Sequence, residues 1–198
     1  MIRFRSSSIV VALLLLAGCA QKSALLVELS ARTAAIPGEG VCGKVETLTI
    51  VDEREGVSER DLRVPLLSRP GQNDEVRPPL SDSVRQVIEG EVRRRIRGDA
   101  EPVAVTVKIT EGVQRFRSRT LVEQESVRWG VEVSLKSVHG HVAAGGEMEA
   151  LAQSRDASLG FVERLSSEAL RGSVAQALEG AAKRLLPGAR ACRATRAA

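Results

Sequence analysis

The chain has 198 residues, of which 43% are hydrophobic and 27% charged, with a formal net charge of +4. This length suits one domain, and the mixture of both charge signs describes a solvated surface, which excludes the strongly basic footprint of a nucleic-acid-binding protein. Because aromatic residues make up only 2% of the chain, the core must be built from Val, Leu, Ile and Ala.

The first 18 residues have the pattern of a secretory signal. Arg3 and Arg5 precede an apolar run at 9–17, which is much shorter than the roughly 20 residues that cross a bilayer. The run ends in Leu16-Ala17-Gly18-Cys19, which resembles the lipobox of bacterial lipoproteins. The resemblance implies that residues 1–18 are removed as a signal peptide and that Cys19 becomes the lipidated N-terminus.

The lipobox also implies a location. Each buried acyl methylene contributes about 0.8 kcal/mol, so two or three chains on Cys19 anchor a protein stably in a membrane. In the lipoprotein sorting pattern, Asp after the cysteine retains the protein in the inner membrane, and here that position is Ala20. We therefore expect the periplasmic face of the outer membrane rather than the inner membrane, with residues 19–24 as lipidated N-terminus and tether.

The first half of the mature chain predicts two strands, at 25–29 and 45–51, separated by a glycine-containing loop at 30–43. Alternation in the second strand places Leu48 and Ile50 on one face, and Val45, Thr47 and Val51 on the other. A long charged loop with several prolines is expected at 52–79.

A helix is predicted at 82–97, capped by Ser81 or Asp82 and closed by Gly98 as a left-handed C-cap. Apolar residues alternate again at 103–109, which predicts a half-buried strand. The polar segment at 111–124 is either an exposed extension of that strand or a loop.

Residues 127–135 form the clearest strand pattern in the chain, and a turn at 139–141 leads to a partner strand at 142–153. The last helix opens at Ser166 or Ser167 and ends before Pro187-Gly188. The basic tail at 187–198 is expected to be frayed.

These elements predict an α+β fold in one domain over 25–186, in the order β-β-α-β-β-β-α. One mostly antiparallel sheet of about five strands, with two amphipathic helices on one face, makes a two-layer sandwich that buries both apolar surfaces. The other face of the sheet is left for water or a partner.

The whole arrangement resembles the YajG-type periplasmic lipoproteins. The resemblance rests on the lipobox, the strand that ends in Val51-Asp52-Glu53-Arg54, and the helix, hairpin and C-terminal helix that follow. It implies a non-catalytic envelope protein. Similar folds occur in the lipoprotein that plugs the lipopolysaccharide-export barrel and in lipoproteins auxiliary to lipid-transporting ABC systems. The loop at 55–79 and the basic tail match no pattern of the family.

Two cysteines remain after Cys19, namely Cys42 and Cys192, one before the first long strand and one after the last helix. In an oxidising periplasm they could form a disulfide that ties the chain ends together, or they could stay as two unpaired thiols.

No convincing catalytic or cofactor site emerges from the sequence. His139 and His141 flank a glycine and are better explained as turn residues than as metal ligands, since zinc needs three or four. Residues 38–43 match G-x-G-x-x-G but precede a strand, not a helix. The acid pairs Glu123/Glu125 and Glu147/Glu149 are expected to lie on solvated faces. We predict no metal, no cofactor and no enzyme activity.

Arg115, Arg117 and Arg119 at alternate positions are the most distinctive polar feature. They could bind lipid phosphates or an acidic partner, or they could blunt an exposed edge strand. The function that follows is an outer-membrane-anchored, non-catalytic adaptor or structural module in an envelope complex. The alternative is a lipid- or small-ligand-binding lipoprotein auxiliary to an ABC-type export or lipid-transport system. An envelope hydrolase that uses the two histidines, Glu147 or Glu149 is the least favoured class.

Overall fold

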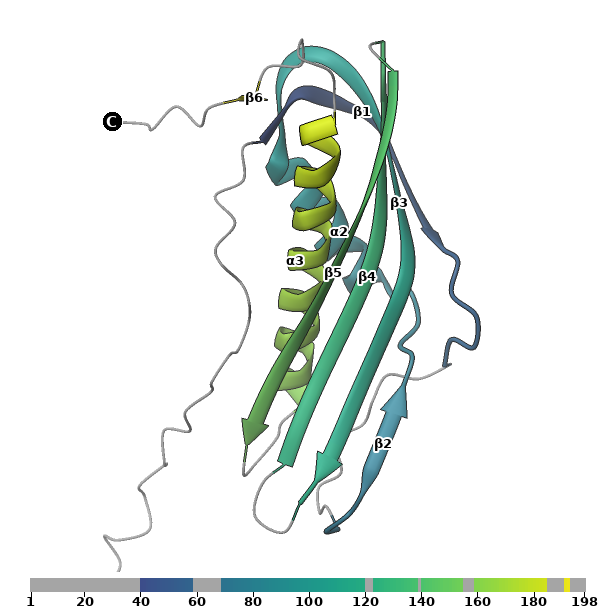
Figure 1. Ribbon diagram of the computed structural model, residues 1–198, viewed down its shortest axis with the longest axis vertical. Helices are drawn as coiled ribbons and strands as arrows, with labels where there is room; N and C mark the ends of the chain where they lie inside the picture. The colour runs from purple at the N-terminus through teal and green to yellow at the C-terminus, as the bar shows by residue number, and fades with distance from the viewer. Residues whose placement is uncertain are drawn as a thin grey trace, which may run out of the picture.

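The computed structural model describes residues 40–58, 69–119, 123–138, 140–154, 159–184 and 191–192. The signal peptide, Cys19, the tether and the predicted strand at 25–29 lie outside these residues. The elements, drawn in Figure 1, are β1 (Gly40–Asp52), β2 (Asn73–Val76), α2 (Asp82–Arg95), β3 (Ile96–Ser118), β4 (Glu123–Ser137), β5 (Gly140–Ser154), α3 (Leu159–Arg184) and β6 (Ala191–Cys192).

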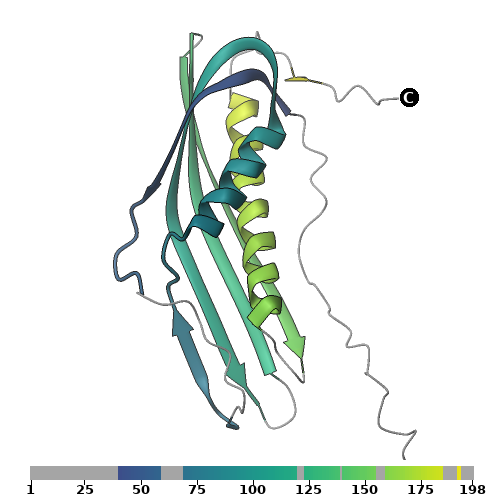
Figure 2. The same ribbon diagram turned by 180° about the vertical axis from the view of Figure 1, so that it is seen from behind.

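The strands form a six-stranded sheet in the order β5-β4-β3-β1-β6, and β2 pairs with β3 beside the main path. All pairings are antiparallel except that of β1 with β3. The predicted α+β class and the mostly antiparallel sheet are therefore confirmed. The sheet is not flat: it curls into a half-barrel, and both helices lie on its concave side (Figures 1 and 2).

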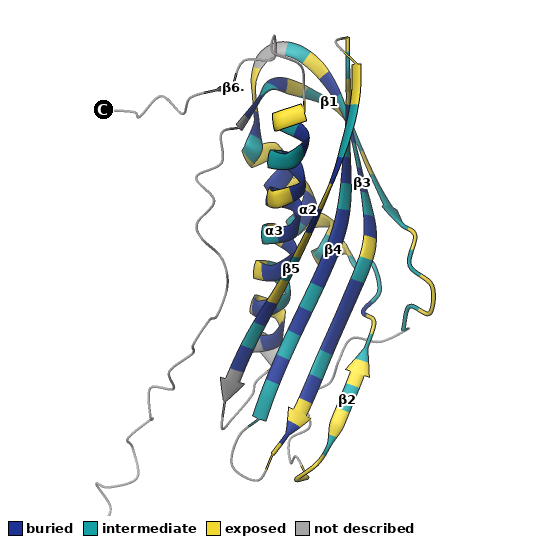
Figure 3. Cartoon of the chain, viewed as in Figure 1, coloured by how far each residue is buried: buried dark blue, intermediate teal, exposed yellow. Residues whose placement is uncertain are grey.

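The core lies between the concave face and the helices. Alternate residues of β3 and β4 point inward and are fully or almost fully buried, as the banded strands of Figure 3 show. Helix α3 packs over β4 and β5, and helix α2 contacts β1 and β3, so the alternation and the helical period predicted from the sequence meet in one cluster. Its most buried members include Val105, Val107, Ile109, Val131, Val133, Leu135, Leu170, Val174 and Leu178.

Strand β1 begins earlier than predicted and changes phase once. Its register against β3 shifts between Val45 and Thr47, which is a β-bulge. The extra residue turns Val45 to the same side as Leu48 and Ile50, and all three pack against the core. The prediction that Val45 faces away from Leu48 was wrong because simple alternation cannot anticipate a bulge.

The connection after α2 also differs from the prediction. Ser81 caps the helix, since its Oγ accepts a hydrogen bond from the Val84 amide. The helix ends at Arg95, however, and β3 starts at Ile96, so Gly98 is not a C-cap. Gly98 has φ +113° inside the arch that carries the chain over the end of the half-barrel (Figure 2). This conformation suits glycine because it has no Cβ.

Of the two alternatives for 111–124, the strand extension is the observed one, since residues 111–118 continue β3. Three other segments were misjudged in extent. The expected loop at 52–79 contains β2, which pairs with this extension. Helix α3 starts at Leu159, so Ser166 lies inside the helix, where its Oγ accepts a hydrogen bond from the Trp129 indole at 3.0 Å. The tail forms β6 at 191–192, which pairs with the start of β1.

Helix α3 approaches β5 so closely that Gly146 has no room for a side chain. A Cβ added at Gly146 would lie 2.7 Å from the Ala177 amide nitrogen and still closer to the Ser173 carbonyl oxygen. On the helix, a Cβ at Gly172 would lie 2.5 Å from Met148 Cε. Small residues on both sides therefore set the distance between the helix and the edge of the sheet.

Replacing Gly146 by Ala should destabilise the protein strongly, because backbone atoms of α3 occupy the space of the new methyl group. We expect a loss of about 2–4 kcal/mol in the free energy of unfolding, measured by urea denaturation. Gly145→Ala is the matched control, since its Cβ would meet only the Val131 carbonyl oxygen at 3.8 Å. Equal losses in the two variants would contradict this account of the helix–sheet contact.

Candidate functional site

The convex face of the sheet brings two of the three predicted arginines together. Arg115 and Arg117 are outward residues of β3, opposite Ser126 and Gln124 of β4. On the other side β2 pairs with the same stretch, with Glu75 opposite Arg115. Because β3 is hydrogen-bonded on both sides here, these arginines do not blunt an edge strand, and that interpretation was wrong.

A shallow depression of about 100 Å³ lies between these side chains on the convex face. Arg115 is held in place by Glu75, with 2.8 Å between its Nε and Glu75 Oε2. The hydrogen bond from Arg115 lowers the pKa of Glu75. Arg117 is exposed and has no ion pair among the described residues. The depression, which we call the arginine depression, is lined by Arg115, Arg117, Gln124, Ser126, Glu149 and Leu151.

Glu149 is the acid that lines the arginine depression, and Arg128 engages two further acids. Arg128 forms ion pairs with Glu111, at 3.4 Å, and with Glu147 across the β4–β5 pair. These carboxylates raise the pKa of Arg128, chiefly through the Glu147 hydrogen bond. Arg117 shares the depression with an amide, a hydroxyl and the Glu149 carboxylate but forms no ion pair among the described residues, and its planar guanidinium is suited to a carboxylate or phosphate from a partner. Arg119 is exposed beyond the end of β3 and does not line the depression.

Glu125 occupies the opposite, concave face and is the main surprise of the structure. Its side chain is only 2% exposed, and neither carboxylate oxygen has a hydrogen-bond partner. Its cross-strand neighbours Phe116 and Ala152 are also buried. The expectation that Glu123 and Glu125 lie on a solvated face is wrong for Glu125. The sequence does contain a signal for this burial, because Glu125 alternates in step with the apolar residues Val127 and Trp129.

Burial raises the pKa of Glu125 to about 7, with a smaller contribution from the negative charge of Glu123. An unpartnered buried carboxylate is costly when ionised and tolerable when protonated. The Glu125 carboxyl therefore changes charge close to neutral pH. It lies on the concave face, on the opposite side of the sheet from the arginine depression.

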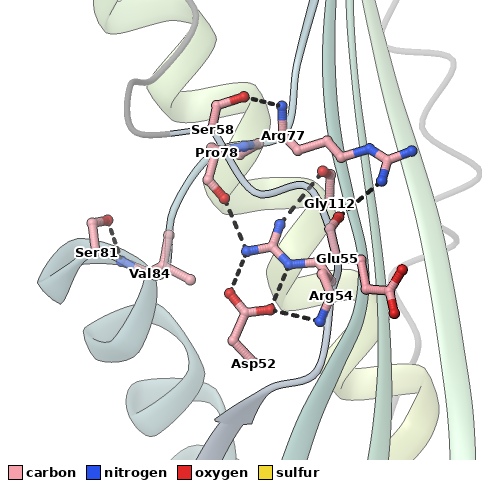
Figure 4. Close-up of polar contacts among 9 residues, drawn as sticks. All are labelled: Asp52, Arg54, Glu55, Ser58, Arg77, Pro78, Ser81, Val84 and Gly112. Atoms are coloured by element: carbon pink, nitrogen blue, oxygen red, sulfur yellow. Dashed lines mark hydrogen bonds and ion pairs between the residues drawn. The ribbon is translucent and has the colours of Figure 1, made fainter.

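A second polar cluster, centred on Arg54, lies at the C-terminal end of β1 (Figure 4). Arg54 is 3% exposed and binds Asp52 through Nε, at 2.7 Å, and Nη2, at 2.6 Å. Its remaining donors reach the carbonyl oxygens of Pro78, at 2.9 Å, and Gly112, at 3.4 Å. The guanidinium carbon lies 5.2 Å from the centre of the Trp129 ring, a cation–π contact. All these donors are used within the fold, so this arginine is structural.

The other predicted candidates are not brought together. His141 is exposed on β5, and Glu147, six residues further along the same strand, is about 20 Å away. His139 lies outside the described residues, and the residues that are described contain no group of three metal-binding side chains. Residues 40–43 of the glycine-rich pattern are extended strand in β1, not the turn before a helix.

Cys42 is disulfide-bonded. The antiparallel pairing of β1 with β6 sets Cys192 opposite Gly40, two residues from Cys42 along β1. This proximity supports Cys192 as the partner, and the pairing itself stays a prediction because the side chain of Cys192 lies outside the described part.

Comparisons with protein-family models, with curated proteins and with solved structures found no match for this chain. The resemblance to the YajG-type lipoproteins therefore stays an expectation from the sequence. Neither described helix has the length and apolar character that crossing a membrane requires.

Replacing Arg54 by Lys should destabilise the fold, because an ammonium group cannot bind Asp52 with two donors and also reach Pro78 and Gly112. The hydrogen bond from Arg54 is the main reason why the pKa of Asp52 is lowered. We expect a loss of about 2–4 kcal/mol in the free energy of unfolding. Arg77→Lys is the control, since exposed Arg77 donates a single side-chain bond to the Glu55 carbonyl. If both changes were equally mild in urea denaturation, the structural role of Arg54 would be refuted.

Replacing Glu125 by Gln should stabilise the protein in a pH-dependent way. The folded carboxyl keeps its proton up to about pH 7, whereas the unfolded one loses it near 4.5. Unfolding therefore releases a proton between these values, and rising pH destabilises the wild type by about 1–3 kcal/mol more than the variant.

Thermal unfolding between pH 4.5 and 8 measures this difference. Asp52, Glu75 and Glu91 do not interfere, because their lowered pKa values move their effects below this window. A stability difference between wild type and Glu125→Gln that stays constant from pH 4.5 to 8 would rule out a buried, titrating carboxyl.

Proposed function

We propose that this protein is an outer-membrane-anchored periplasmic lipoprotein that acts as a non-catalytic adaptor in an envelope complex, and that it binds its partner through the convex face of the sheet. The anchor is the lipidated Cys19 predicted from the lipobox. The proposal includes the two-layer description of the fold, because one helical layer on the concave side leaves the other sheet face free for a partner.

The arginine depression is the observation that carries this proposal. Both helices lie on the concave side (Figures 1 and 2), so none of the described elements covers the convex face. Other cations of the sheet are paired with carboxylates, as Lys108 is with Glu53 at 3.0 Å. Arg117 forms no ion pair among the described residues, although Glu75 and Glu149 lie near it, and Arg115 beside it is already oriented by Glu75. An acidic group from a partner would complete this arrangement.

The convex face is a better candidate than strand addition at the β5 edge. The outward amide of Glu147 donates to Gln176 Oε1 at 3.0 Å, and the Ala143 carbonyl accepts from Arg184 Nη1 at 2.6 Å. Side chains of α3 thus occupy backbone groups that an added strand would need.

The second candidate is a lipid- or small-ligand-binding lipoprotein allied to an ABC-type system. A ligand pocket between sheet and helices is disfavoured, because Trp129, Ile109 and Leu170 are fully buried there among close-packed neighbours. What favours this candidate is a groove between α2 and α3 that Arg94 and Arg171 line.

A photo-crosslinking residue at Gln124, inside the arginine depression, should give a discrete adduct with one envelope protein in living cells. The same crosslinker at Glu89, exposed on α2, is the matched control and should not give that adduct. Arg117→Glu should abolish the Gln124 adduct by reversing the charge, whereas Arg119→Glu should leave it. Adducts that are identical from Gln124 and Glu89, or indifferent to Arg117→Glu, would overturn the proposed binding face.

The anchor is tested separately with Cys19→Ser. We expect this variant to lose membrane sedimentation, because no acyl chain can be attached, while its thermal unfolding stays unchanged. A Cys19→Ser protein that still sediments with membranes would remove the anchor from the proposal.

A further inference from the structure

A groove of about 450 Å³ runs between α2 and α3 on the side that faces away from the sheet. Its volume falls within the range of about 300–1,000 Å³ that is typical of small-molecule sites. Residues of both helices line it, and the sequence of either helix alone does not indicate it, because it depends on how the two helices pack. The lining residues are Gln86, Val87, Gly90, Glu91, Arg94 and Arg171.

The groove is cationic, and part of it is rigidly held. Glu91 is 3% exposed and accepts hydrogen bonds from Arg94 Nε, at 2.9 Å, Arg94 Nη2, at 2.6 Å, and Arg95 Nε, at 2.5 Å. Burial opposes ionisation of Glu91, but the two arginines outweigh it and lower its pKa. Two guanidinium groups thus share one carboxylate, so the cluster of Glu91, Arg94 and Arg95 keeps a net positive charge. Arg94 is fixed with its Nη1 group outside the ion pair.

Arg171 supplies a second cation from the other helix. It is exposed and has no ion pair among the described residues. Two guanidinium groups on different helices, with an amide at Gln86 and an apolar patch at Val87, form a set suited to an anion with several oxygens.

Gly90 is the independent observation that points to a ligand. A glycine inside a helix is destabilising relative to alanine. At Gly146 the backbone of α3 leaves room only for glycine, but a Cβ added at Gly90 would meet nothing within 4 Å. No packing contact therefore explains a glycine in the middle of α2. A side chain at this position would extend into the groove, so its absence keeps the groove open.

We propose that the α2–α3 groove binds a phosphate ester between Arg94 and Arg171. A phospholipid headgroup and a soluble phosphate offer the same chemistry. The inference does not depend on the adaptor role; only the headgroup as the source draws on the proposed membrane anchor, which would hold the domain where such groups are abundant.

The test titrates the full mature chain, in non-ionic detergent, with three water-soluble probes followed by calorimetry. Glycerophosphoglycerol represents an anionic headgroup, glycerophosphocholine is its zwitterionic counterpart, and inorganic phosphate represents the free anion. We expect the first to bind and the second to bind at least about tenfold more weakly, because its ammonium group meets two arginines. Phosphate binding as tight as glycerophosphoglycerol would assign the site to free phosphate, and weaker phosphate binding to the headgroup.

Two variants separate a built site from general charge attraction. Arg171→Glu should weaken glycerophosphoglycerol binding at least about tenfold, whereas Arg93→Glu, on the same helix as Arg94 but outside the groove, should not. Gly90→Leu should abolish binding by filling the groove while the melting temperature stays equal or rises, since leucine favours the helix. No binding of any probe by the wild type, equal losses in Arg93→Glu and Arg171→Glu, or unchanged binding by Gly90→Leu would overturn the proposal. None of these results bears on the Cys19→Ser experiment.

Discussion

The packing around Trp129 determines how the sheet, the helices and the long connection fit together. This is the only tryptophan of the chain, and it is fully buried on the concave face of β4. Its indole nitrogen donates to Ser166 and so fixes α3, and its ring receives the guanidinium of Arg54 at the end of β1. Across the β3 pair lies Gly112, where a Cβ would come within 2.6 Å of the ring. A chain with few aromatic residues thus uses one of them to join three elements.

Much of the fold follows from the sequence because its signals are local and periodic. The alternation at 127–135 and 142–153 is continued in the observed β4–β5 hairpin, and Ser81 caps α2 as its position indicates. The errors occur where tertiary context decides. A bulge reverses Val45, the arch at Gly98 replaces a helix cap, and β2 forms inside the expected loop at 52–79 because β3 pairs with it.

The candidate sites were less predictable than the fold, because each depends on which elements lie side by side. Alternate arginines in β3 are visible in the sequence, but the pairing of Arg115 with Glu75, forty residues away, is not. The alternation of β4 did indicate that Glu125 is buried. Charged residues are usually exposed, however, and the sequence prediction followed this general tendency instead of the local pattern. The groove between α2 and α3 could not be derived from either helix alone, since Arg94 and Arg171 come from separate segments.

The two sides of the half-barrel differ in the way they treat charge, and this difference links structure to the proposed roles. On the concave side, charges are either balanced in full, as for Arg54 with Asp52, or held neutral below about pH 7, as for Glu125. On the solvent sides of the sheet and of the helices, Arg117 and Arg171 each form no ion pair among the described residues. Each of them is also next to a second arginine that a buried or neighbouring glutamate already orients.

The glycines can also be divided into those that the packing requires and one that it does not. At Gly112 and Gly146 a side chain would collide with the Trp129 ring or with the backbone of α3, so stability alone accounts for them. Gly90 collides with nothing and weakens the helix that contains it, so stability argues against it. A position that reduces stability without any packing benefit is best explained by what it leaves open. In this fold it leaves open the floor of a cationic groove, with one arginine from each helix beside it.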